Sequence, residues 1–126
     1  MTYLEKWFDF NRRQVELEAI LEQTIADQSD QNLTLKEFYL LHFLNQAQEK
    51  SLRQIDLPDK LHLSPSAVSR MVARLEEKNC GLLSRRCCDQ DKRASFICLT
   101  SEGQTTLAYL QKAVEESLET KADWLF

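Results

Sequence analysis

The sequence predicts a mainly helical domain that carries one small antiparallel β-hairpin. Only two Gly and two Pro occur among 126 residues, and 43% of the residues are hydrophobic. A globular chain so poor in turn formers is typical of long helices, and its length fits one domain. Apolar residues recur at helical spacing along most of the chain. The exception is residues 82–99, where two short apolar runs flank a charged turn, as in a hairpin.

Residues 2–27 are predicted to form one long N-terminal helix. The apolar residues that recur at helical spacing are Leu4, Trp7, Phe8, Val15, Leu17, Ile20, Leu21 and Ile25. So wide an apolar face needs cover from the rest of the domain or from a second subunit. The sequence shows neither a signal-peptide pattern nor the roughly 20 apolar residues of a membrane span. We therefore expect a cytoplasmic protein with no membrane contact.

Two further helices are predicted before residue 62. Thr34 and Glu37 have the spacing of a capping box, and the run EFYLLHFLNQA that follows is almost continuously apolar. Such a run indicates a central helix that is buried on most sides. A short helix is expected over residues 52–61, capped by Ser51. We expect it to be irregular or broken at Pro58, because proline inside a helix removes a backbone hydrogen bond.

The next helix is predicted over residues 64–78. Ser64 followed by Pro65 is a strong helix start, and Gly81 suits a left-handed turn after the helix end. The predicted buried stripe consists of Val68, Met71, Val72 and Leu75. The residues on the opposite side are Ser66, Ser69, Arg70 and Arg74. Two strands over residues 82–87 and 94–99 then form the hairpin, and a last helix opens at Thr100.

This order of elements is that of a winged helix-turn-helix, which presents its second helix to the major groove of DNA. Ser66, Ser69 and Arg70 suit base edges, whereas Arg74 suits phosphates. Ser64 opens the helix, whose free N-terminal amides add a phosphate contact.

The hairpin, or wing, supplies a second predicted DNA contact. Its basic side chains, which we expect to converge near the tip, are Arg85, Arg86, Lys92 and Arg93. A thin cationic hairpin can reach the minor groove, whose negative potential favours arginine. We assign Asp91 to orienting an arginine, because a carboxylate that faces phosphate would repel it. Residues 64–93 carry a net charge of +3 within a chain of net charge −4, so the basic surface is local.

These residues resemble the MarR family of bacterial winged-helix regulators. The resemblance covers residues 52–103 and rests on the stretches LHLSPSAVSRMVARLEEK, LLSRR and DKRASFICLTSEG. It implies a homodimer that binds a pseudo-palindromic operator in double-stranded DNA, usually as a repressor released by a small ligand or by oxidation. It also implies an N-terminal dimerisation helix (1–27), a DNA-binding lobe (34–99) and a C-terminal dimerisation helix (100–126).

The adjacent thiols of Cys87 and Cys88 suggest a redox switch. They lie near basic residues, which favour the reactive thiolate. We hypothesise that their oxidation distorts the wing and weakens DNA binding. The alternative is that all four cysteines are inert, reduced thiols without a disulfide.

A small-molecule effector pocket is a second hypothesis. The residues that would line it are Trp7, Phe8, Phe38, Tyr39 and His42. Core packing of these side chains is the favoured alternative, since an aromatic or histidine on an apolar helical face is more often part of the core.

An enzyme is not expected. The sequence has no Gly-rich phosphate loop, no G-x-S-x-G or H-E-x-x-H motif and only two His. No Cys-x-x-Cys pair occurs either, so we expect no catalytic residues, no cofactor and no metal site. The open alternative is a winged-helix module that binds a protein partner without sequence-specific DNA binding.

Overall fold

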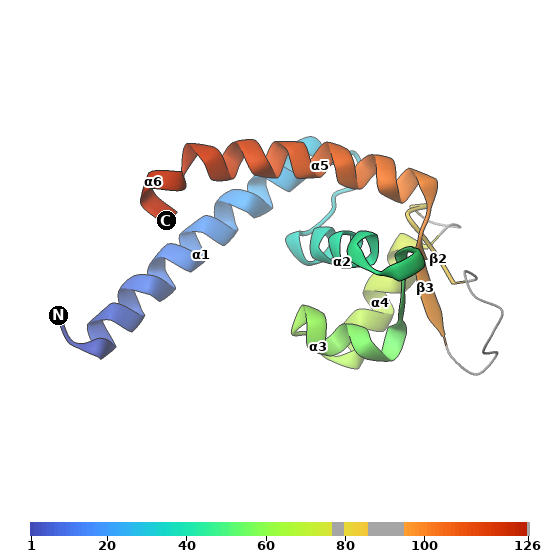
Figure 1. Cartoon of the computed structure of the whole chain (residues 1–126), viewed down its shortest axis with the longest axis horizontal. Helices are drawn as coiled ribbons and strands as arrows, with labels where there is room; N and C mark the ends of the chain where they lie inside the picture. Colours follow the sequence, from blue (N-terminus) through green and yellow to red (C-terminus); the bar gives the residue numbers. More distant parts are fainter. Residues whose placement is uncertain (77–79, 86–94, 126) are drawn as a thin grey trace. The chain divides into compact units, whose positions relative to one another are not determined.

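The computed structural model describes residues 1–76, 80–85 and 95–125, and the chain divides into two compact units (Figure 1). The first unit comprises residues 1–35 and 110–126, and the second comprises residues 36–109. The helices are α1 (Tyr3–Gln28), α2 (Leu35–Gln46), α3 (Leu57–Leu61), α4 (Pro65–Leu75), α5 (Ser101–Thr120) and α6 (Ala122–Leu125). The 3₁₀ turns are η1 (Gln48–Lys50) and η2 (Gln54–Asp56), and the strands are β1 (Ser51–Arg53), β2 (Leu83–Ser84) and β3 (Phe96–Leu99). The predicted fold class, mainly helical with a small antiparallel sheet, is confirmed.

Helix α1 confirms the long N-terminal helix and begins at a capping box. The Glu5 amide donates to Thr2 Oγ1 at 3.1 Å, and the Thr2 amide donates to Glu5 Oε2 at 2.7 Å. The buried residues of this helix are Leu17, Leu21 and Ile25. Within the same unit, the hydroxyls of Thr24 and Ser117 lie 2.9 Å apart and join α1 to α5.

Helix α2 is the buried central helix that its apolar run predicts, since Leu40, Leu41 and Leu44 are fully buried. The amide of Leu35, its first residue, donates to Glu22 Oε1 of α1 at 2.7 Å. A carboxylate from a neighbouring helix thereby satisfies one of the free donors at this helix start.

The predicted helix over residues 52–61 is wrong in its first half. Residues Ser51–Arg53 form strand β1, and Leu52 pairs with Ile97 of β3. A tertiary partner therefore overrides the local helical pattern. Pro58 lies in the first turn of α3, where its missing amide costs no helix hydrogen bond, and the expected irregularity lies just before it, at the 3₁₀ turn η2.

Helix α4 begins as predicted, because Ser64 Oγ accepts a hydrogen bond from the Ala67 amide at 3.1 Å and Pro65 follows at the first helical position. It ends at Leu75, earlier than residue 78. Glu76 is already extended, with ψ of 162°, and forms a parallel bridge with Leu83.

The sheet has the order β1-β3-β2, with both pairs antiparallel. β2 and β3 are the base of the predicted hairpin, whereas its tip, residues 86–94, lies outside the described residues. The third strand, β1, was not predicted.

The junction between the sheet and α5 depends on Thr100 and Gly103. The Thr100 hydroxyl accepts a hydrogen bond from the Gly103 amide at 3.0 Å and donates to the Gly81 carbonyl oxygen at 2.7 Å. A Cβ atom at Gly103 would press on the carbonyl oxygen of Leu82 and would lie 2.6 Å from Leu99 Cδ1. The stretch LTSEG therefore has a structural role: it caps α5 and seats it closely on the strands.

Candidate nucleic-acid interface

Helix α4 presents two chemically different faces. Val68, Val72 and Leu75 are buried, so they fix one side of the helix to the second unit. The exposed residues of the predicted DNA-reading set are Ser64, Ser66, Ser69 and Arg70. Small hydroxyls near the helix start, followed by one long cation, leave room for a base pair and offer hydrogen bonds to its edge. This placement agrees with the sequence-based prediction.

A polar network extends from Ser69 to the base of the wing. Gln54 Nε2 of η2 donates to Ser69 Oγ at 3.2 Å, and Arg85 Nη1 donates to Gln54 Oε1 at 2.9 Å. Arg85 Nε also pairs with the carboxylate of Glu76. Arg85, which we expected near the wing tip, lies instead at the wing base, and it is linked to α4 through Gln54. Sequence reasoning missed Gln54, because a lone glutamine in a short turn carries no pattern.

A cavity of about 560 Å³ opens beside this network. Its lining includes Arg53, Gln54, Pro58, Pro65, Ser69 and Arg85. Among the described residues that line it, two are arginines and none is acidic. The surface next to the start of α4 is thus cationic, which suits a neighbouring phosphate group.

Arg74 has a partner within the protein. Its Nη2 lies 2.9 Å from Oε1 of Glu37 on α2, and its Nη1 lies 3.7 Å from the Sγ of Cys80. Glu37 is only 3% exposed, whereas the Arg74 side chain is 39% exposed. The guanidinium that we expected on a phosphate is therefore turned towards a buried carboxylate.

Several predicted wing residues lie outside the described part of the chain. These are Arg86, Asp91, Lys92 and Arg93, together with the candidate redox pair Cys87 and Cys88. Of the other two cysteines, Cys80 is a free thiol and Cys98 of β3 is disulfide-bonded. The expectation of four reduced thiols is therefore wrong for Cys98.

The residues of the candidate effector pocket are divided between the two units. In the first unit, Trp7 and Phe8 are exposed. In the second unit, Phe38 is buried, and Tyr39 and His42 are half-buried on the same helix. Core packing accounts for Phe38, and the pocket itself stays a prediction.

The first half of α1 carries an exposed apolar surface. Its large exposed residues are Tyr3, Leu4, Trp7, Phe8, Phe10 and Val15. The rings of Trp7 and Phe10 stack with their centroids 6.2 Å apart. A run of exposed aromatic and aliphatic side chains on one helix marks an interaction surface.

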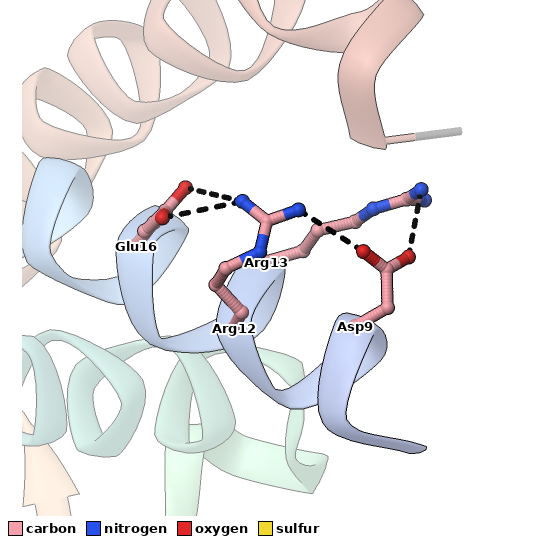
Figure 2. A network of polar contacts seen from close by, with 4 residues as sticks. All are labelled: Asp9, Arg12, Arg13 and Glu16. Atoms are coloured by element: carbon pink, nitrogen blue, oxygen red, sulfur yellow. Dashed lines mark hydrogen bonds and ion pairs between the residues drawn. The ribbon is translucent and has the colours of Figure 1, made fainter. Parts of the chain in front are cut away.

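Charged side chains on the same half of α1 are paired with one another (Figure 2). Arg12 lies 3.0 Å from Asp9 and 3.3 Å from Glu16, and Arg13 lies 2.9 Å from Asp9. The hydrogen bond to Asp9, followed by that to Glu16, raises the pKa of Arg12 above its ordinary value. These exposed pairs support the helix only locally, because water and salt screen them.

No helix in residues 1–76, 80–85 or 95–125 has the length and apolar character needed to cross a bilayer. Within the same residues, no group of three or more His, Cys, Asp or Glu side chains is placed to hold a metal ion.

Comparison with known proteins identifies similar chains. The model of the MarR family matches residues 33–95. Sco3205 of Streptomyces coelicolor, a MarR family transcriptional regulator solved in complex with DNA, is 25% identical with a TM-score of 0.80, over 95% of this chain and 77% of its own. AbsC of the same organism, also a MarR family transcriptional regulator, is 24% identical with a TM-score of 0.82. The match covers 100% of this chain and 83% of AbsC.

NadR, solved in complex with 4-hydroxyphenylacetate, has the same fold at 19% identity, with a TM-score of 0.75, over 94% of this chain and 79% of its own. No curated protein matches the sequence significantly.

Proposed function

The chain belongs to the MarR family, and from this membership we propose that it is a repressor that binds a pseudo-palindromic DNA operator as a homodimer. The observation that carries the proposal is the exposed face of α4, where Ser66, Ser69 and Arg70 stand opposite the buried stripe. A helix with this division can enter the major groove while its other side stays fixed to the domain. DNA binding by the similar protein Sco3205 supports the same reading.

The proposal of a homodimer is based on the exposed apolar residues in the first half of α1. Trp7, at 57% exposure, and its neighbours would be covered by a second copy of the chain. Two copies related by a two-fold axis would place two recognition helices about 34–36 Å apart, which suits consecutive major grooves on one side of the duplex. Trp7→Glu should shift the protein towards monomer in analytical ultracentrifugation, and a matched change at an exposed residue outside both proposed dimerisation helices, Gln48→Glu, should not.

Release of the operator would follow binding of a small ligand or oxidation of the wing thiols. The complex of NadR with 4-hydroxyphenylacetate supports a small-molecule effector as the first route. A wing cysteine that is a free thiol, Cys87 or Cys88, supplies the second route, because nearby cations favour the reactive thiolate. Treatment with diamide should lower operator affinity, and an unchanged affinity would remove the thiol route.

Titration of duplex DNA at two salt concentrations tests the proposal against a protein-binding module. Fragments selected from a random duplex library provide the specific site, and a scrambled duplex is the control. Specific binding should weaken steeply with salt because phosphate contacts release counterions. A protein that binds selected and scrambled duplexes equally weakly would be a protein-interaction module and not a regulator of this type.

A further inference from the structure

Glu37 and Arg74 form an ion pair between α2 and the recognition helix α4. Glu37 is the one charged residue that is buried among the described residues, and its Oε1 lies 2.9 Å from Arg74 Nη2. Its neighbours on α2 include the fully buried Leu40 and Leu41. A carboxylate in such surroundings is stable only when it is paired and hydrogen-bonded, because removal from water penalises an uncompensated charge.

Arg74 spans from this carboxylate to the segment that follows α4. Its Nη1 is directed at the Sγ of Cys80, 3.7 Å away, while its Nη2 binds Glu37. The planar guanidinium therefore ties three parts of the second unit together: α2, the last turn of α4 and the residues beyond it. Movement of α4 against α2 would separate the ion pair and leave a buried charge.

We propose that Arg74 is a positioning residue, which acts on DNA binding through Glu37 by holding α4 on α2, and that it does not contribute a phosphate contact. The inference rests on the proposed DNA binding and gives Arg74 a different role within it. It also assigns Glu37, which no DNA molecule can touch at 3% exposure, an effect on operator affinity.

The two roles of Arg74 predict opposite effects of Glu37→Gln. The substitution preserves shape but removes the buried negative charge. If Arg74 positions α4, Glu37→Gln lowers affinity for the selected operator by about tenfold and leaves the salt dependence unchanged, because no phosphate contact is lost. If Arg74 instead serves phosphate, Glu37→Gln frees it, so that affinity rises and the salt dependence steepens.

The experiment measures operator affinity across a salt series for the full chain and for three variants, Glu37→Gln, Arg74→Gln and the double variant. We expect both single variants to lose affinity with slopes of log K against log salt that match the unmodified protein. We expect the double variant to be little weaker than either single variant, since all three break the same contact. Arg74→Lys should recover part of the affinity, because lysine keeps one charged hydrogen bond to Glu37.

Three outcomes would overturn the inference. One is a slope that flattens by about 0.9 per lost contact in Arg74→Gln, the signature of a phosphate ligand. The second is additive losses in the double variant, and the third is a gain of affinity in Glu37→Gln. Should Arg74→Gln fail to fold, the sign of the change in operator affinity in Glu37→Gln decides alone.

The unmodified protein separates this inference from the proposed function. If it shows no salt-dependent duplex binding, the proposed function fails and the inference fails with it. If that binding is normal, the variants test only the inference.

Discussion

The side-chain amide of Gln54 donates a hydrogen bond to the hydroxyl of Ser69, with 3.2 Å between Nε2 and Oγ. Ser69 is one of the residues expected to reach a base edge, and Gln54 lies in the turn that precedes α3. The same glutamine accepts a hydrogen bond from Arg85 at the wing base. The orientation of the Ser69 hydroxyl, which we propose faces a base edge, is therefore set by a residue outside α4.

Gln54→Ala should relax sequence preference at the base position nearest Ser69. Loss of the amide frees the serine hydroxyl and removes one of the two acceptors of the Arg85 guanidinium, while Glu76 remains paired with it. We expect a cost of about 1 kcal/mol, or about fivefold in affinity for the preferred operator. Binding to a panel of single-base operator variants measures the preference. Gln104→Ala, an exposed glutamine on α5, is the matched control and should leave the preference intact. An unchanged base profile in Gln54→Ala would show that the hydrogen bond has no part in readout.

Arg70 and Arg93 should have separable roles. Arg70→Ala removes an exposed cation from α4 and should change which operator sequence is preferred, at a cost of about 1–3 kcal/mol if the contact is to a base. Arg93→Ala in the predicted wing should instead lower affinity for most sequences. Selection of bound duplexes from a random pool measures both effects. Equal losses on every sequence for both variants would contradict this division of roles.

Ser64 should serve both the helix and the DNA. Ser64→Ala removes the acceptor of the Ala67 amide and should lower the free energy of unfolding by about 1 kcal/mol in urea. Ser64→Asp keeps a capping oxygen and adds a charge that the helix N-terminus favours, so its stability should stay near that of the unmodified protein.

The order of the two Ser64 variants in operator affinity should be the reverse of their order in stability. Aspartate places a negative charge beside the phosphates, so Ser64→Asp should bind operator more weakly than Ser64→Ala despite being more stable. The same rank order for stability and for affinity would show that the start of α4 does not approach the duplex.

Gly103→Ala should destabilise the second unit. At an unobstructed helix position, alanine stabilises the helix by about 1 kcal/mol relative to glycine. At this position, however, the new Cβ would press on the Leu82 carbonyl and on Leu99 Cδ1, so we expect a net loss of about 1–3 kcal/mol. Thermal or urea unfolding measures it, and Gln104→Ala one residue later should change stability by about 0.5 kcal/mol or less. A more stable Gly103→Ala protein would mean that α5 can shift away from the strands without cost.

The strongest local signals in the sequence predicted their elements well. The Ser64–Pro65 pair gave the start of α4, because an N-cap followed by proline has a local physical cause that tertiary contacts seldom reverse. The continuous apolar run around Leu40 predicted a buried central helix, and that too is confirmed. These inferences need only the neighbours of each residue along the chain.

The features that sequence reasoning missed depend on distant partners. Leu52 lies in a strand because it pairs with Ile97, and the sequence around Leu52 carries no pattern that predicts this pairing. The contact of Arg74 with Glu37 likewise joins residues 37 positions apart, and the local sequence predicts only a helix-capping role for Glu37. Periodicity places a residue on a helix face, but it does not tell whether a long side chain curls back to a neighbour.

The central place of β3 has a consequence for how this protein is made. Ser51 of β1 pairs with Cys98, and Leu83 of β2 pairs with Leu99. Both outer strands therefore depend on β3, which follows them in the sequence. During synthesis, β1, α3, α4 and β2 all leave the ribosome before β3, the strand with which both β1 and β2 pair. Pairings between such distant residues are slow to form, and a nascent chain that stops before Phe96 leaves Leu52 and Leu83 without their partner strand. The sheet of the second unit can therefore close only after residue 99 has been synthesised.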